Sequence, residues 1–267
     1  HDQCKFYIPV AYNNNRKDID AMDCELQLLG LLITDGTLNK ISNAITITQS
    51  ERHQFVIDYI NRVLNSCGLK FTKSKIREKG HKTNIGVCKY ASYRWTISKG
   101  KPRGRDKDKI GWGSLPWFSL NAGKKIPHDI KHKVSKRQFM IFAEALHMGY
   151  GVKNFKTGYK ICCGNIELAN DLQFAAINNG LSSNMLKGSN SVKLVTIHDK
   201  GFRSVTTKAK DRKKAFQKQE IEEQSWCLET VNKTLVIRHN GRVSITGNCQ
   251  IIVRGMRIFE GKENCFI

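Results

Sequence analysis

The sequence predicts a mixed α/β (α+β) protein of two similar halves, followed by a β-rich C-terminal segment. Two short apolar helices, at 28–36 and 142–151, each end in a glycine. Strand-like and helical stretches follow each of them, and the helix in each half stops at a glycine, Gly68 or Gly180. Ordinary core packing does not by itself produce a repeat of this length. The two halves therefore predict a pseudo-symmetric fold.

The first apolar helix ends in a carboxylate, which is an unusual residue for this position. Asp35 stands directly before the terminal glycine, Gly36. The helix dipole places partial negative charge at this end, so a bare carboxylate there costs free energy unless a cation compensates. In the second helix, aligned on its last glycine, Ala145 replaces Gly30 and Tyr150 replaces Asp35. A compensating cation is therefore expected at the end of the first helix.

Hydrophobic periodicity predicts the elements that follow each helix. Period-two alternation with β-branched residues indicates strands, and a 3.6-residue period indicates helices. We expect strands at 5–10, 44–48, 70–76, 93–98, 159–163, 192–197, 226–231, 235–239 and 242–246. The expected helices begin after Gln49 in the first half and span 166–178 in the second. Asn240-Gly241 is a typical two-residue hairpin turn between the last two strands.

The charge of the chain indicates the chemistry of its partner. Among 267 residues, 45 are Lys or Arg and 23 are Asp or Glu, which gives a net charge of +22 and a pI near 9.7. Such a charge suits a protein that neutralises phosphates along a nucleic acid, and it predicts strongly salt-dependent binding. A basic, solvated surface is the alternative.

Cysteine usage and hydropathy indicate the compartment. The nine cysteines include no CxxC pair, their number is odd, and no signal peptide precedes them, which disfavours a disulfide framework or a zinc site. No apolar run approaches the ~20 residues of a membrane span. We expect no membrane association, and a monomer with reduced thiols in the cytoplasm of a bacterial or phage-infected cell.

The sequence LLGLLITDG at 28–36 resembles the LAGLIDADG motif of homing endonucleases, and FAEALHMGYG at 142–151 resembles the second copy in a single-chain member. The resemblance covers about residues 23–204. It implies a pair of αββαββα repeats whose motif helices cross at the centre. It also implies that an acid from each helix end binds the metal ions that cleave double-stranded DNA. Two ordinary buried helices are the alternative, because short apolar runs are common in any core.

The resemblance implies catalytic roles for particular residues. It assigns Mg²⁺ (or Mn²⁺) to Asp35 and to Gly149, which precedes the second acid position. Gln49 and Lys99 become candidates for orienting water and stabilising charge, with ordinary surface residues as the alternative. Tyr150 cannot replace a carboxylate, because a phenol with a pKa of ~10 stays protonated at neutral pH. We therefore expect cleavage to be lost or reduced to one strand.

The same resemblance predicts how a long, asymmetric DNA target is bound. Outward side chains on the strands would contact base edges, and the basic run at 99–109 would contact phosphates. A solvated loop is the alternative for that run. Residues 124–127 resemble the KK.P linker of the family. The base-reading candidates are Thr46, Thr48, Arg94 and Thr96, and the phosphate-binding candidates are Lys101, Arg103 and Arg105.

The C-terminal part resembles a different kind of protein. SWCLETVNKTLVIRHNGRVSITGN at 225–248, followed by Cys249, resembles the C-terminal splicing blocks of an intein, which belong to a β-rich, Hint-type fold. There Asn248 would cyclise to release the downstream chain, and the Cys249 thiol would hold the transferred acyl group. Cys227 with Thr246 matches the class 3 inteins, in which an internal cysteine attacks the upstream junction. Gly247 departs from the usual histidine.

These resemblances predict a domain order and leave three functions open. We expect the end of an upstream splicing segment at 1–22, an endonuclease domain at 23–215 with repeats at about 23–120 and 121–204, splicing blocks at 223–248, and the start of the downstream host protein, an extein in cis, at 249–267. The chain is then a site-specific endonuclease, a non-cleaving DNA-binding module, or a splicing element with a passive insert.

Overall fold

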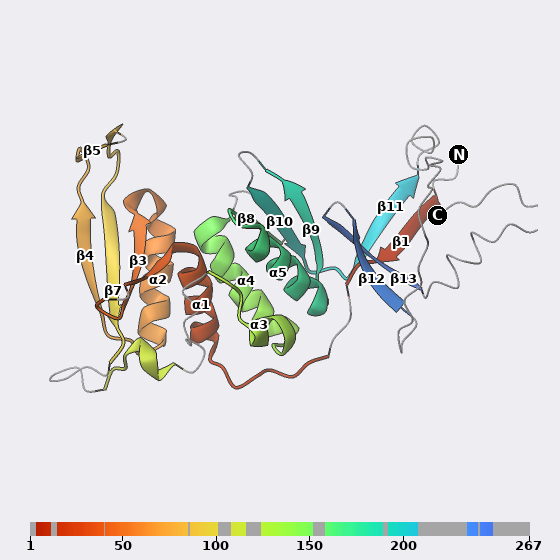
Figure 1. Ribbon diagram of the computed structural model, residues 1–267, viewed down its shortest axis with the longest axis horizontal. Coiled ribbons are helices and arrows are strands. Elements are labelled where there is room, and N and C mark those ends of the chain that lie inside the picture. The colour runs from red at the N-terminus through yellow and green to blue at the C-terminus, as the bar shows by residue number, and fades with distance from the viewer. Residues whose placement is uncertain are drawn as a thin grey trace, which may run out of the picture.

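The computed structural model describes residues 4–11, 15–39, 41–84, 86–100, 108–115, 124–151, 158–188, 192–207, 234–239 and 241–247. It is an elongated α+β molecule in which two sheets lie outside a central group of helices (Figure 1). The α+β class is the one that the sequence predicts. No helix among the described residues is long and apolar enough to cross a membrane.

The first half has the helix and strand order α-β-β-α-β-β. Its elements are α1 (Asp23–Asp35), β2 (Gly36–Asn39), β3 (Ala44–Ser50), α2 (Gln54–Ser66), β4 (Phe71–Arg77) and β7 (Ser92–Ser98), with the short strands β5 (Lys82–Thr83) and β6 (Gly86–Val87) between the last two. The four longer strands form one antiparallel sheet in the order β2-β3-β7-β4. The expected strands of this half are therefore present within about two residues.

Helix α2 begins and ends where its sequence signals lie. The Ser50 side chain accepts a hydrogen bond from the main-chain N–H of Arg52, in the short 3₁₀ turn that leads into the helix. At the other end Gly68 has a φ of +63°, a conformation in which other residues are strained. Val63 and Leu64 are completely buried, which fixes the face that α2 turns to the core.

The second half follows the same plan with fewer described strands. It contains α3 (His128–His132), α4 (Lys136–Tyr150), β8 (Tyr159–Cys163), α5 (Ile166–Asn178), β9 (Ser182–Lys187) and β10 (Lys193–His198). Its sheet has the order β8-β10-β9. An isolated bridge between Gly151 and Ile161 stands where Gly36 pairs with Ile47 in the first half. Strand β9 was not expected from the sequence, because its residues are mostly polar and do not alternate.

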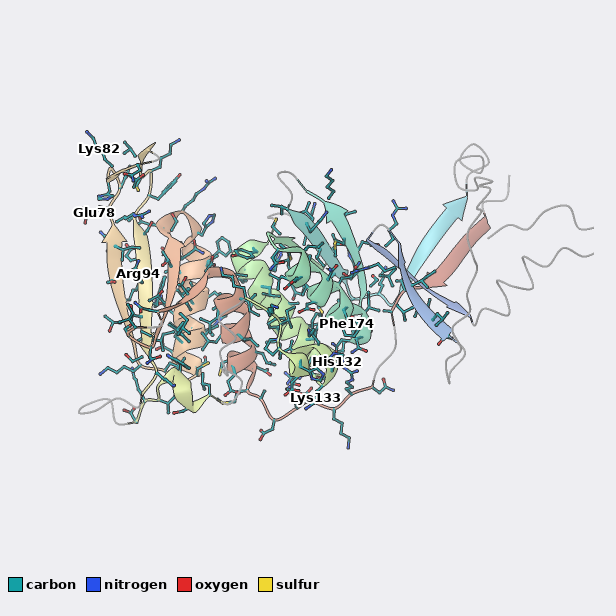
Figure 2. All side chains as sticks on the ribbon, in the orientation of Figure 1. Glu78, Lys82, Arg94, His132, Lys133 and Phe174 are labelled. Atoms are coloured by element: carbon teal, nitrogen blue, oxygen red, sulfur yellow. The ribbon has the colours of Figure 1, made fainter. Side chains whose placement is uncertain are left out.

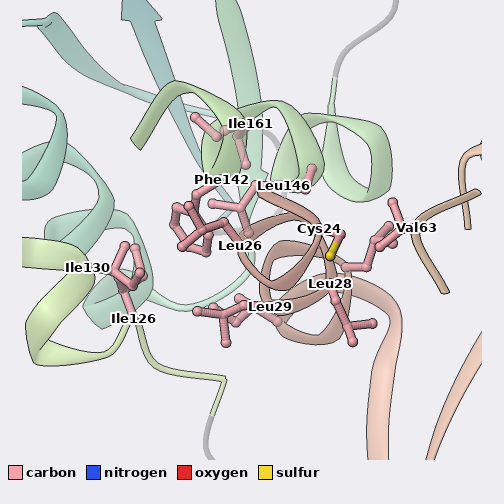
Figure 3. Packing of buried hydrophobic residues seen from close by; sticks show 14 of the residues in the cluster. Cys24, Leu26, Leu28, Leu29, Val63, Ile126, Ile130, Phe142, Leu146 and Ile161 are labelled. Carbon is pink, nitrogen blue, oxygen red and sulfur yellow. The ribbon is translucent and has the colours of Figure 1, made fainter. Parts of the chain in front are cut away.

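One hydrophobic core joins the two halves through α1 and α4. Helix α1 packs mainly on α4, and the side chains of Leu28, Leu31, Phe142 and Leu146 are at most 1% exposed. Figure 3 shows Phe142 and Leu146 beside residues of α1 at this contact. The two motif-like helices are therefore the centre of the molecule, with a sheet on either side.

Segments that flank the repeats form separate small sheets. Strand β1 (Cys4–Pro9) pairs antiparallel with β11 (Phe202–Thr207), and β12 (Thr234–His239) pairs with β13 (Arg242–Gly247). The sequence places β11 inside the endonuclease range that ends at 215, but its partner is the strand that precedes both repeats. Among the described residues, the last strand of a repeat sheet is β10, which ends at His198.

The C-terminal hairpin is held against the second half. Gly241, at its turn, has a φ of +74°, and its carbonyl accepts hydrogen bonds from the Met185 N–H at 2.7 Å and from Gln173 Nε2 at 2.8 Å. Arg238 of β12 donates to Asn170 Oδ1 at 2.8 Å. The hairpin predicted around Asn240-Gly241 is present, and polar contacts attach it to α5 and β9.

Candidate active site at the helix crossing

Helices α1 and α4 approach closely because small residues face each other at two levels. A Cβ added to Gly30 would lie 2.6 Å from Cβ of Ala145 and 3.0 Å from the carbonyl oxygen of Phe142. One turn further, a Cβ added to Gly149 would lie 2.5 Å from Cβ of Thr34. Carbon atoms do not come this close, so each glycine sets the distance between the helices. The crossing brings the C-terminal ends of α1 and α4 together.

Both helices end in the same way. Gly36 and Gly151 have nearly identical extended conformations, with φ and ψ of −80° and 150° in the first and −74° and 148° in the second. The N–H of each glycine donates to the carbonyl of the residue four positions earlier. A Cβ at Gly36 would lie 2.5 Å from Cα of Leu32, so close approach, not backbone dihedrals, requires glycine here. This supports aligning Tyr150 with Asp35.

Asp35 lies at the crossing point with most of its carboxyl group out of water. Its Oδ2 would be 3.0 Å from a Cβ at Gly149, and Gln49 Nε2 donates to the same oxygen at 3.4 Å. Burial raises the pKa of Asp35 to about 6, and the positive charge of Lys124 partly offsets that rise. The carboxylate therefore lacks full compensation for its charge and would be stabilised by a further cation.

Lys124 joins the two helix ends, and sequence reasoning assigned it no role. Its Nζ donates to the carbonyl oxygen of Thr34 at 2.8 Å and to the hydroxyl of Tyr150 at 3.2 Å. Lys124 has a φ of +51°, which is rare for a residue other than glycine. The sequence feature that could have identified Lys124 is its position in the KK.P-like linker. The ammonium group stands between Asp35 and the position where a second acid is expected.

The donor atoms at this site suit some cations better than others. Among the described residues, no group of three or more His, Cys, Asp and Glu side chains could enclose a metal ion. Mg²⁺ usually keeps several waters and is held by one or two carboxylates together with substrate phosphates. The partly buried Asp35 carboxylate fits that kind of site, with no cage made by the protein alone. Tyr150 does not fit as a second anionic ligand.

Gln49 and its counterpart in the second half have different environments. Ile47 pairs with Gly36 and Ile161 bridges to Gly151, so the residue two positions after each isoleucine is equivalent. In the first half this residue is Gln49, which contacts Asp35. In the second half it is Cys163, which is completely buried and whose pKa is raised to about 12 by burial. The second half therefore lacks both the carboxylate and the amide of the first.

The structure does not bring Lys99 to Asp35, in contrast to the role that the resemblance implied. Ser98 pairs with Ala44 at one end of β3, whereas Gly36 pairs with Ile47 towards the other end. Lys99 and Asp35 are thus about five residues apart along the sheet, or roughly 17 Å at the rise of a strand. The Lys99 ammonium instead lies 5.6 Å from the centre of the Trp112 ring. Lys124 is the lysine beside Asp35.

The four base-reading candidates lie on one face of the β2-β3-β7-β4 sheet. The pairing aligns Thr37, Thr46, Thr96 and Thr72 in one row across all four strands, and Thr48, Arg94 and Ser74 in the next row. Arg94 and Thr48 are exposed, and Thr46 and Thr96 are half-buried. Alternate residues such as Ile47 and Trp95 are completely buried on the opposite face. Lys101, Arg103 and Arg105 lie outside the described residues.

Most of the splicing candidates lie outside the described residues. This holds for Cys227, Asn248 and Cys249. The backbone of Thr246 lies in β13, where it pairs with Leu235. The expected strand at 226–231 also falls outside the described part of the chain. The described hairpin therefore tests the strands expected in this segment, and it does not test the roles of the splicing residues.

Comparisons with known proteins give structural neighbours only. The sequence matches no protein-family model, and no characterised protein sequence matches it. Mesophilic variants of the homing endonuclease I-DmoI superpose with a TM-score of 0.41 at 16% identity, covering 72% of this chain and 92% of theirs. I-DmoI in complex with DNA and calcium gives 0.40 at 15% identity, covering 72% and 86%. Full-length WhiA from Thermatoga maritima gives 0.39 at 13% identity, covering 65% and 50%.

The N-terminal LAGLIDADG domain of WhiA also superposes, with a TM-score of 0.37 at 16% identity, covering 66% of this chain and 74% of that one. At these values we base the proposals below on the geometry of this chain and on the sequence resemblance. Both identify the same two helices and the same carboxylate.

Proposed function

We propose that this chain is a divalent-metal-dependent DNA endonuclease of the LAGLIDADG type that cuts one strand of a long, asymmetric double-stranded target. The observation that carries the proposal is the partly buried Asp35 carboxylate at the end of α1, pressed against Gly149 of α4 at the helix crossing. A carboxylate whose pKa is raised by burial in such a place is a candidate functional group. The charge of +22 fits a polyanionic substrate.

The residues around Asp35 have separate roles in this proposal. A bound Mg²⁺ or Mn²⁺ ion would supply an activated water and would stabilise charge on the leaving oxygen. Asp35 would hold the ion, and Gln49, whose amide contacts Asp35, would orient a water molecule beside it. The Lys124 ammonium, fixed by Thr34 and Tyr150, lies where it can stabilise negative charge on a phosphate.

The second half supports cleavage of one strand rather than two. Tyr150 and Cys163 stand at the positions equivalent to Asp35 and Gln49. Tyr150 brings no carboxylate to the end of α4, and burial raises the pKa of the Cys163 thiol to about 12. In this proposal Asp35 is the carboxylate that would bind a metal ion at the crossing. Nicked DNA is the expected product.

The test uses supercoiled plasmid that carries the host gene without its insertion, incubated with Mg²⁺ or Mn²⁺. The unchanged chain should convert it to nicked circles, and Asp35→Asn should lose at least ~100-fold in rate while still binding the plasmid. Tyr150→Asp restores the second carboxylate and should give linear DNA. Failure of both the unchanged chain and Tyr150→Asp to cut would contradict the endonuclease proposal.

A non-cleaving DNA-binding module is the second candidate, and one observation favours it. The Lys124 ammonium already bridges the ends of the two helices through Thr34 and Tyr150, which supplies positive charge where a metal ion would act. In that case the unchanged chain and Asp35→Asn bind duplex DNA equally well and neither nicks it. The plasmid experiment separates the two functions, because binding and cutting are measured on the same samples.

We further propose that the nuclease unit is an insert in a protein-splicing element. The pairing of β1 with β11, on either side of the repeats, supports an insertion, and the β12–β13 hairpin directly precedes Asn248. The Asn248 side-chain nitrogen would attack its own main-chain carbonyl, forming a succinimide. The peptide bond to Cys249 would break and leave a free amine on Cys249. Mass spectrometry of the intact chain reports this cleavage as loss of residues 249–267.

A further inference from the structure

A basic hairpin projects from the first sheet beyond the helices that cover it. We call Arg77–Tyr90 the arm; it continues β4 and returns through β5 and β6 to the start of β7. Figure 1 shows β5 at the far end of β4 and β7, beyond the end of α2. In Figure 2 Glu78 and Lys82 lie at this projecting end, and Arg94 lies lower on the sheet.

The arm is an ordered hairpin without a core of its own. The Gly80 N–H donates to the Cys88 carbonyl at 2.8 Å, and the Cys88 N–H donates to the His81 carbonyl at 2.9 Å. Gly80 and Gly86 have φ values of +89° and +125°, which explains why glycine occupies both positions. An isolated two-stranded hairpin is only marginally stable in water. A partner that contacts the arm would therefore add to its stability.

The described side chains of the arm are available to such a partner. Val87 is 60% exposed and Tyr90 is 46% exposed, so neither large side chain packs into the body of the molecule. Lys79, Lys82 and Lys89 are also exposed. Within the described parts of the chain, no carboxylate lies within ion-pair distance of these three lysines. Their ammonium groups are free for an external anion.

The charge of the arm is almost entirely of one sign. Arg77 and the three lysines are opposed by Glu78 alone, and Glu78 pairs with Lys75 at 3.5 Å. Positive side chains along a narrow two-stranded ribbon can each neutralise a phosphate of a duplex. An exposed tyrosine among them adds an aromatic surface but no negative charge. The arm therefore suits a nucleic-acid backbone better than an apolar partner.

We propose that the arm binds the phosphate backbone of duplex DNA. The contacts would lie outside the DNA segment that faces Arg94 and the row of four threonines across the β2-β3-β7-β4 sheet. This inference rests on the proposed function, because the arm extends the same sheet that would face the target. The register shift between Lys75 and Arg77 marks a bulge where the arm leaves the sheet, and bulges redirect strands. The arm thereby adds sequence-independent contacts on the side of the first repeat.

The number of lysines in the arm sets the strength of these contacts. The chain turns between Glu78 and His81, because the His81 N–H donates to the Glu78 carbonyl at 3.2 Å, and β5 and β6 then extend the hairpin to its tip. Lys79, Lys82 and Lys89 are the lysines that the arm presents beyond the sheet. With three lysines on phosphates, the slope of log K against log salt should change by about 2.7 units, at about 0.9 for each contact.

The experiment measures the affinity of the full chain for a 40-base-pair mixed-sequence DNA duplex between 50 and 200 mM salt. Replacement of Lys79, Lys82 and Lys89 by alanine should reduce the salt slope by about 2.7 units. Over this fourfold range in salt, the unchanged chain then loses about 40-fold more affinity than the variant. Bound duplex should also protect the three lysines, but not Lys133, from acetylation.

A matched control removes the same charge far from the arm. Lys17, Lys133 and Lys136 are exposed and lie near the N-terminal ends of α1 and α4, about one helix length from Asp35. Their replacement by alanine should change the slope by less than one unit, and circular dichroism checks that both variants are folded. Equal slopes for the two triple variants would overturn the arm proposal while the proposed function stands.

Two further outcomes separate the alternatives. If the unchanged chain does not bind the duplex even at 50 mM salt, the proposed function fails and the role of the arm fails with it. If the arm variant loses slope on a double-stranded RNA of the same length but keeps it on DNA, RNA is the partner and the proposal is wrong. A loss of slope on DNA together with lysine protection supports it.

Discussion

At the residue scale, the environment of Asp35 links stability to metal binding. The carboxyl group is mostly buried and has one nearby cation, Lys124, which does not cancel the effect of burial on its pKa. The site is therefore destabilised when the carboxylate ionises, and a bound cation would relieve that cost. The same Asp35 carboxylate oxygens are thus costly to bury in ionised form and are the proposed metal ligands.

The pH dependence of stability tests this view of Asp35. Its pKa is about 6 in the folded chain against 3.8 ordinarily, so between these values the folded state binds the proton more tightly. The contribution of Asp35 to the free energy of unfolding therefore falls as pH rises from about 4 to 6. Asp35→Asn should be more stable than the unchanged chain at pH 7.5, by up to about 3 kcal/mol, and the difference should vanish below about pH 4.

Ionisation of Asp35 lowers the stability of the folded chain, whereas metal binding should raise it. This effect can be measured without DNA. Mg²⁺ or Mn²⁺ should raise the melting temperature of the unchanged chain at pH 7.5, because it binds the folded carboxylate. The same ions should not change the melting temperature of Asp35→Asn. Equal shifts in both proteins would mean that the ions bind elsewhere.

At the element scale, the close approach of the two helices that meet at the centre depends on small residues within their buried apolar faces. Gly30 against Ala145 and Gly149 against Thr34 set how closely α1 and α4 approach. The glycines that end both helices then direct each chain into its sheet. The position of Asp35 follows from these contacts, so changes in packing should alter the site even when no catalytic residue is replaced.

A pair of substitutions tests whether close approach matters at Gly30. Gly30→Ala should lower the free energy of unfolding by about 1–3 kcal/mol, because its Cβ would overlap Cβ of Ala145. Adding Ala145→Gly removes the overlap and should recover part of the loss, although glycine within a helix costs about 1 kcal/mol. Chemical denaturation of the four proteins gives the coupling energy. Strictly additive effects would contradict the proposed contact.

At the scale of the whole molecule, the repeats lie between segments that are distant in sequence. Strand β1 pairs with β11, and the β12–β13 hairpin rests on α5 and β9 through Gly241 and Gln173. The completely buried Gln173 also donates to the Ser183 carbonyl at 3.2 Å, so it joins the hairpin turn to the second sheet. The segment before Asn248 is thereby attached to the nuclease unit.

Release of the C-terminal residues tests the splicing proposal on the whole chain. During long incubation with a thiol at neutral pH, the intact chain should lose the mass of residues 249–267, while Asn248→Ala should keep it, because alanine has no amide to cyclise. Cys227→Ala serves as a matched control, since that thiol is not needed for cyclisation. An unchanged mass in the native chain after several days would count against the proposal.

The local pattern of the sequence determined the α+β class, the two motif-like helices, the lone acid Asp35 and most strand positions, because periodicity, β-branched residues and helix-ending glycines act over a few residues. The local pattern did not predict features that depend on contacts between distant segments of the chain. The polar strand β9, the pairing of β1 with β11, the position of Lys99 far from Asp35 and the role of Lys124 depend on which segments meet in space. Strand register and the helix crossing decide those positions, since both are set by burial and close packing between segments that local sequence patterns do not relate to one another.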